Sequence, residues 1–196
     1  MEAKHRLTPS DIMPMAEYAA IRKEKRREII EQKRNRRLAV GPYATFHFES
    51  YQSMWLQVHE MLYIEKGGAE QVAGELDAYN PLIPKGEELV ATIFFEIDDP
   101  ERRRTVLAEL GGVEETVFMR LDEETVNAAP EKDQDRTSEE GKASSVQFVH
   151  FAFTQAQIRR FKTPGEHVLL GFEHPQYGHM TVLPEPIRAA LAADFD

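Results

Sequence analysis

The sequence predicts an α+β fold in which a mixed or antiparallel sheet packs against helices, with a long basic helix near the N-terminus. Three observations support this prediction. Short segments alternate apolar and polar residues, the pattern of half-buried strands. Longer segments carry apolar residues at helical spacing and end at glycine or proline. The connections between the later strands are short for a sheet of parallel crossovers. The 196 residues are expected to form one domain.

The first helix is expected over residues 8–36. Thr8 is a suitable N-cap, Pro9 suits the first helical position, and Pro14 is expected to restart the helix. Local signals then predict two strands and two helices in turn, over residues 38–40, 43–49, 51–66 and 69–79. Gly67 and Gly68 separate the two helices.

Two segments of the second half, residues 90–104 and 146–160, align without gaps. Each combines an apolar strand, an N-cap residue and a helix with a basic end, and Asp98 and Thr154 are the matching N-caps. A second strand is expected after each helix, over residues 116–121 and 167–172. The match is mostly one of pattern rather than identity, so two β-α-β units related by an internal twofold are one open interpretation.

Residues 122–145 separate these two units and contain eight acidic and three basic residues. The segment has almost no apolar side chains to bury, so we expect a mobile insertion, poorly ordered over residues 128–144. A short helix over residues 187–193 should close the fold by docking on the body.

The net charge of −10 is unevenly distributed, because residues 22–37 hold nine Lys or Arg against three Glu. A basic helix on an acidic body favours a docking surface for an acidic protein partner or for a second copy of the chain. Nucleic acid is a less suitable partner, since no aromatic residues interrupt the basic run. A solvated helix face with internal ion pairs is the alternative.

The absence of cysteine excludes an iron–sulfur cluster held by cysteine, so any metal would need His, Asp or Glu ligands. No segment is apolar and long enough to cross a membrane, and a cytoplasmic location is expected.

Candidate site residues are polar groups set in apolar sequence. Glu60 follows His59 on the 51–66 helix, but position 63 is a tyrosine, which breaks the zincin motif. Glu96 and His150 each interrupt an apolar strand, and the hypothesis is that the two meet, with Glu60 or His174 nearby. The alternative is a buried structural hydrogen bond, or an edge position that faces water.

The segment Phe172–His179 adds further candidates. His174, Tyr177 and His179 lie in a predicted turn. The candidate polar site therefore comprises Glu60, Glu96, His150, His174 and Tyr177. The candidate ligands for a divalent metal are Glu96, His150, His174 and His179.

A core of apolar residues is expected to be largely buried, comprising Trp55, Val58, Leu62, Phe95, Ile97, Val149, Phe151 and Leu169.

Several segments together resemble the bacterial family known as domain of unknown function 3501, and ELDAYNPLIP is the most specific of them. The others are RRLAVGPYATFHFES, QVHEMLYIEK, VATIFFEIDDPERR, SSVQFVHFAF, GFEHPQY and RAALAADFD. The resemblance implies an association with a rubrerythrin-type protein and an iron–sulfur oxidoreductase similar to heterodisulfide-reductase subunits. It implies no activity.

Two functions therefore remain open from sequence. One is a non-enzymatic accessory or docking protein of a redox or peroxide-related system. The other is a metal- or small-molecule-binding protein with a His/carboxylate site, which includes the option of an enzyme.

Overall fold

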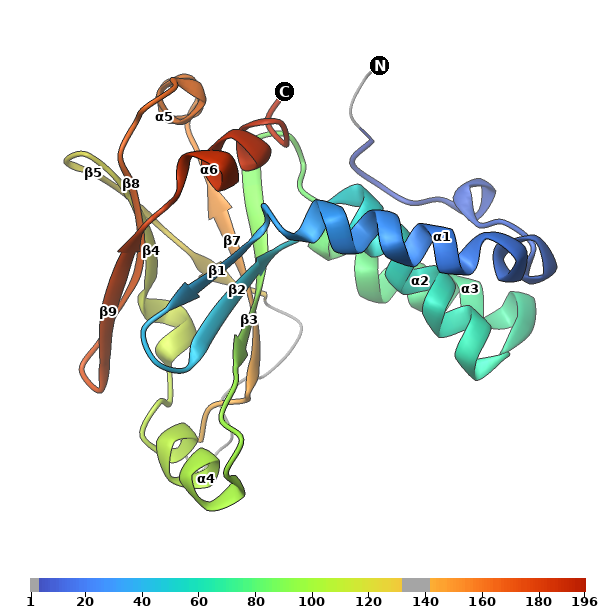
Figure 1. Cartoon of the computed structure of the whole chain (residues 1–196), viewed down its shortest axis with the longest axis horizontal. Coiled ribbons are helices and arrows are strands. Elements are labelled where there is room, and N and C mark those ends of the chain that lie inside the picture. Colours follow the sequence, from blue (N-terminus) through green and yellow to red (C-terminus); the bar gives the residue numbers. More distant parts are fainter. Residues whose placement is uncertain (1–3, 132–141) are drawn as a thin grey trace.

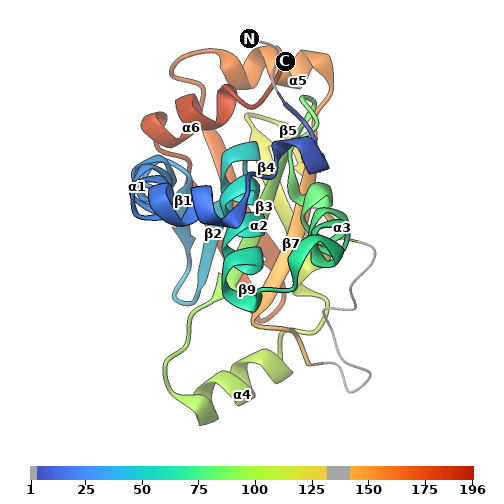
Figure 2. The ribbon, with the colours of Figure 1, turned by 90° about the vertical axis from the view of Figure 1, so that its right-hand side faces the viewer.

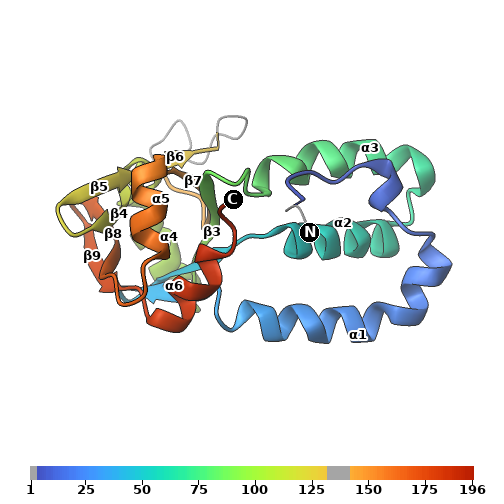
Figure 3. The ribbon, with the colours of Figure 1, turned by 90° about the horizontal axis from the view of Figure 1, so that it is seen from above.

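A computed structural model describes residues 4–131 and 142–196. It shows a body of two β-sheets from which an arm of three helices projects (Figure 1). The arm consists of α1 (Met15–Lys33), α2 (Tyr51–Glu65) and α3 (Gly68–Tyr79). The three helices lie side by side at one end of the molecule (Figure 3). The predicted α+β fold is confirmed.

The helices of the arm begin and end where the sequence signals predict, with one exception. Ser50 caps α2, because its hydroxyl accepts a hydrogen bond from the Ser53 N–H, and a Ser50→Ala change should cost about 1 kcal/mol. Lys66 ends α2 in the left-handed conformation. The exception is the first helix, since Pro9–Asp11 forms a separate 3-10 turn and α1 starts only after Pro14.

The strands form two antiparallel sheets in the described part of the chain. The first sheet has the order β1-β2-β3-β7-β6, and the second has the order β5-β4-β8-β9. The strands of the first sheet are β1 (Arg37–Val40), β2 (Ala44–Phe48), β3 (Glu88–Phe95), β6 (Ala129–Pro130) and β7 (Val146–Ala152). The strands of the second are β4 (Val117–Leu121), β5 (Glu124–Asn127), β8 (Val168–His174) and β9 (Tyr177–Val182).

Strand pairing in both sheets follows an internal twofold, the interpretation that the sequence alone leaves open. The units are β3-α4-β4 and β7-α5-β8, with α4 at Pro100–Ala108 and α5 at Gln155–Lys162. In each unit the helix links one sheet to the other, so short connections suffice. β3 pairs with β7, and β4 pairs with β8. Thr92 pairs with Phe148, and these residues are also equivalent in the sequence alignment. Asp99, rather than Asp98, caps α4.

Helices close both ends of the sheet body. α5 and α6 (Glu185–Ala192) lie at one end, and α4 lies at the other (Figure 2). The chain ends of α5 and α6 meet through Phe161 and Phe195, whose ring centroids are 5.4 Å apart. The final short helix is therefore docked on the body, as predicted.

Two apolar clusters stabilise the fold. The larger lies between the two sheets, and the smaller joins the arm to β3 through residues such as Val58, Leu62 and Val90. Six predicted core residues are buried: Val58, Leu62, Phe95, Ile97, Val149 and Phe151. Trp55 and Leu169 are only half-buried, because Trp55 borders a groove between α1 and α2 and Leu169 lies on the outer face of the second sheet.

The predicted mobile insertion is partly wrong. Its first residues form β5 in a tight hairpin with β4, then β6 adds to the edge of the first sheet, and Ala128 and Ala143 are buried. Backbone pairing and these few buried side chains together order segments that contain little apolar sequence. Residues 132–141 lie outside the described residues. In the described part of the chain, no helix has the length and apolar character that spanning a membrane requires.

Candidate functional site

The structure places the five candidate polar residues at separate points. Glu60 lies on the arm, Glu96 follows the end of β3, and His150 lies in β7. His174 and Tyr177 flank the β8–β9 turn. The expected convergence of these residues on one cavity is therefore wrong.

Glu96 and His150 lie on the same face of the first sheet, each near the C-terminal end of its strand, and these ends point in opposite directions because β3 and β7 are antiparallel. The antiparallel register pairs His150 with Val90, six residues before Glu96, which is a separation of roughly 20 Å. Glu96 instead accepts hydrogen bonds from Thr45 (2.5 Å) and Arg37 (3.1 Å). Thr45 and Arg37 lower the pKa of the Glu96 carboxyl. The sequence locates both residues on one face, but it does not reveal the strand direction.

His150 does meet carboxylates, although different ones. Its Nδ1 lies 3.1 Å from Glu88 and its Nε2 lies 2.9 Å from Glu131, so the ring bridges β3 to the residue after β6. Burial by itself would lower the pKa of His150, but the two carboxylates outweigh burial and the pKa is raised. The arrangement stabilises an imidazolium between two carboxylates.

Glu60 connects two helices of the arm. Its carboxylate accepts hydrogen bonds from Arg22 (2.7 and 2.8 Å) and from the Tyr18 hydroxyl (2.5 Å). The Arg22 guanidinium is the main reason that the pKa of Glu60 is lowered. The adjacent His59 is fully buried, donates from Nδ1 to the Trp55 carbonyl and accepts at Nε2 from the Met13 N–H. Glu60 and His59 therefore both hold α2 against the neighbouring segments.

His174 and Tyr177 bond mainly to backbone. His174 donates to the Gly111 carbonyl and accepts from the Gln176 N–H. The buried Tyr177 hydroxyl donates to the Val40 carbonyl and accepts from two N–H groups of the β1–β2 turn region. Tyr177 thereby joins the second sheet to the first. The third member of this segment, His179, packs edge-on against the Tyr177 ring at 4.6 Å.

Metal ligation needs at least three donors that face a common point. In residues 4–131 and 142–196, no three His, Asp or Glu side chains are arranged to hold a metal ion. Around His150 the ring lies between the two carboxylates, which each contact a different ring nitrogen.

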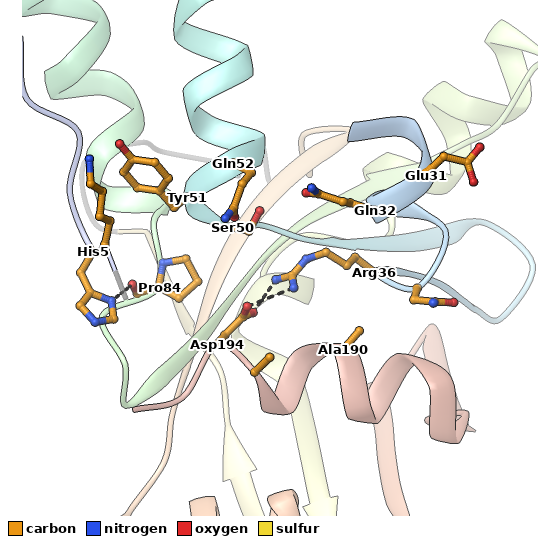
Figure 4. A pocket seen from close by; sticks show the side chains of 13 residues that line it. His5, Glu31, Gln32, Arg36, Ser50, Tyr51, Gln52, Pro84, Ala190 and Asp194 are labelled. Carbon is orange, nitrogen blue, oxygen red and sulfur yellow. Dashed lines mark hydrogen bonds and ion pairs between the residues drawn. The ribbon is translucent and has the colours of Figure 1, made fainter. Parts of the chain in front are cut away.

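A cavity of about 440 Å³ lies at the junction of arm and body. It is lined by residues of the N-terminal segment, the end of α1, the start of α2, and α6 (Figure 4). On one side of it the Arg36 guanidinium binds both carboxylate oxygens of Asp194 and donates to the carbonyls of Phe48 and Glu49. Burial raises the pKa of Asp194 even though Arg36 opposes this shift. Sequence reasoning missed this pair, because 158 positions separate its members.

The outer flank of the arm carries a second candidate surface. A shallow groove of about 460 Å³ is lined by Arg22, Lys23, Arg26, Arg27, Ala19, Ile30 and Tyr63, which we call the basic flank. Ile30 is 60% exposed, although it is a large apolar residue. The Arg22 guanidinium lies 4.6 Å from the centre of the Tyr63 ring. Cations and apolar surface are therefore combined in one groove.

This is an α+β protein. Its two antiparallel sheets form the body, and its projecting arm carries the basic flank. The chain belongs to the family described as Protein of unknown function (DUF3501), whose model matches residues 6–195. It is similar to the crystal structure of a novel protein of unknown function from Burkholderia pseudomallei, with 34% sequence identity and a TM-score of 0.89. That match covers 97% of this chain and 99% of the other. Comparison with curated proteins gave no match.

Proposed function

We propose that this protein is a non-enzymatic accessory protein that docks, through the basic flank of its arm, on an acidic surface of a partner protein. The observation that carries the proposal is the basic flank itself, where exposed cations surround an exposed apolar side chain. The expected setting is a redox or peroxide-related system, as the family resemblance implies.

Only some of the cations of the basic flank form ion pairs within the fold. Arg22 and Arg26 share the single carboxylate of Glu60, at 2.7 and 3.9 Å. In the described residues, Lys23 and Arg27 form no ion pair. Two positive charges therefore remain available on this surface, and an acidic partner would supply their counter-charges.

Ile30 indicates a protein partner. Exposed large apolar residues within a charged surface are typical of binding sites, because their burial in a complex releases water from apolar area. An acidic segment with an apolar side chain between Asp or Glu residues would match the groove. A phosphate backbone would match the cations but leave Ile30 exposed.

The test is binding to the two partners that the family association implies, a rubrerythrin-type protein and the iron–sulfur oxidoreductase. We expect one of them to bind, with affinity that falls as salt rises. The double variant Lys23→Glu with Arg27→Glu should weaken binding by at least roughly tenfold, since each reversed contact costs on the order of 1 kcal/mol or more.

The matched control is Arg104→Glu with Arg159→Glu, which changes the net charge equally at exposed positions on α4 and α5. Equal loss of binding in both double variants would mean that only net charge matters, which contradicts a specific flank. Binding to neither partner would also overturn the proposal. A salt-dependent complex with duplex DNA that Lys23→Glu abolishes would assign the flank to nucleic acid instead.

A further inference from the structure

A second groove lies on the other side of α1 from the basic flank. A cleft of about 230 Å³ between α1 and α2 is bounded by Ile29, Tyr51 and Trp55. The cleft shares Gln32, Tyr51 and Gln52 with the cavity at the arm–body junction, so the two form one continuous groove. The groove has an apolar aromatic end and a polar end, which is the usual composition of a small-molecule site.

The aromatic end is built from rigid side chains. The Trp55 indole N–H donates to the Asp11 carbonyl (3.0 Å), and its ring packs on the His59 ring at a tilt of 32°, with 3.8 Å between centroids. Trp55 is nevertheless only half-buried, and it lines the cleft opposite Ile29. The aromatic ring of a ligand would pack there against Trp55, whose own ring is fixed by these contacts.

The charges at the polar end are already balanced. Arg36 pairs with Asp194, and Lys4 pairs with Asp11 at 2.7 Å. The other charged residues of the lining also have partners: Glu31 with Arg34 at 3.1 Å, His5 with Asp196 at 3.1 Å, and Lys25 with Glu28 at 2.8 Å. A charged ligand would have to compete with these pairs. An uncharged ligand would not.

Three side-chain amides at the polar end form no hydrogen bond within the described part of the protein. They belong to Gln32, Asn35 and Gln52, which line the cavity as solvent-exposed side chains. In Figure 4, Gln32 and Gln52 project from two different helices toward the space above the Arg36–Asp194 pair. Each amide offers two donors and an acceptor, which suits hydroxyl or amide groups of a ligand.

We infer that this groove binds an uncharged small aromatic compound with a hydroxyl- or amide-bearing tail. The ring packs beside Trp55, and the tail bonds to the amides of Gln32, Asn35 and Gln52. The inference does not depend on the docking function, because the basic flank and this groove share no lining residue.

The test uses two uncharged probes, N-acetyl-phenylalaninamide and adenosine, each paired with an anionic counterpart, N-acetyl-phenylalanine and adenosine monophosphate. Binding is measured by titration calorimetry and by the emission of Trp55, the single tryptophan of the chain. At least one uncharged probe should bind and shift the emission. Its anionic counterpart should bind at least roughly tenfold more weakly. N-acetylglycinamide, which has a tail but no ring, should not bind.

Gln52→Leu should weaken probe binding by roughly five- to tenfold, since one hydrogen bond is lost. Gln176→Leu is the matched control, because it makes the same change at an exposed position in the β8–β9 turn and should leave binding unchanged. The inference is overturned if neither uncharged probe binds, if the anion binds as well as its uncharged counterpart, or if Gln52→Leu has no effect.

Discussion

Replacing His150 with Gln should destabilise the protein in acid and have much less effect in base. The ring of His150 bridges Glu88 and Glu131, and all three side chains are 17–18% exposed. A hydrogen bond to a charged group contributes about 1.5–3 kcal/mol, and partial exposure reduces that value. The change should therefore lower the free energy of unfolding by about 1–3 kcal/mol when the imidazole is protonated.

The pH dependence follows from the raised pKa of His150 in the folded protein. Unfolded, the imidazole has a pKa of about 6.5. Because the folded state binds the proton more tightly, the stabilisation is fully present below about pH 6.5 and is lost as pH rises through the folded pKa. His150→Gln should therefore cost most near pH 5.5 and least near pH 9.

Urea denaturation at these two pH values measures the effect, with the free energy of unfolding extrapolated to water. His174→Gln is the control, because the His174 ring bonds to two backbone groups rather than to carboxylates. An equal loss of stability at both pH values for His150→Gln would refute the imidazolium bridge.

Three further predictions follow from buried contacts. Asp194→Ala should cost about 3–5 kcal/mol in urea denaturation, because it leaves the buried guanidinium of Arg36 without a counter-charge. A change below about 1 kcal/mol would show that water compensates the charge. Tyr177→Phe should cost about 1–3 kcal/mol, since three backbone groups lose their hydroxyl partner, and an unchanged denaturation midpoint would contradict this. Glu96→Gln and His150→Phe should be additive within about 0.5 kcal/mol in a double-mutant cycle, as expected for distant residues; a larger coupling energy would contradict their separation.

The sequence predicts most elements of this fold because their signals are local. Thr154 and the glycines after α2 act within one turn of the chain, and strand alternation needs only a few residues. The sequence predicts only a turn where β9 begins, because Pro175 and Gly178 favour a turn there. The turn itself is confirmed between β8 and β9.

Local sequence signals do not predict contacts between residues that are far apart in the chain. Arg36 lies in a run of basic residues that resembles a solvated helix face, and only the fold shows that it is buried against Asp194. Glu131 lies in an acidic segment, so nothing in its neighbourhood marks it as a partner of His150. A charged residue in an apolar strand indicates that a partner exists, but the partner depends on strand direction and register.

The internal twofold also shows which connection of the repeated body is extended to form the arm. In the first sheet β2 flanks β3, and β6 flanks β7, so the inner strands β3 and β7 have equivalent neighbours. In the second sheet β4 and β8 each continue through a two-residue turn into an edge strand, β5 or β9. Each half of the body is therefore a ββαββ unit.

The two halves differ in the connection between their first two strands. Between β2 and β3 the chain forms α2 and α3, whereas the equivalent connection between β6 and β7 is the acidic segment that includes residues 132–141. Together with α1, which precedes the first unit, this connection builds the arm. Both surfaces assigned a binding role lie on the arm or at its base, and so outside the repeated body. The duplicated body therefore supports the arm through the apolar cluster at β3, and the arm carries the surfaces to which we assign binding.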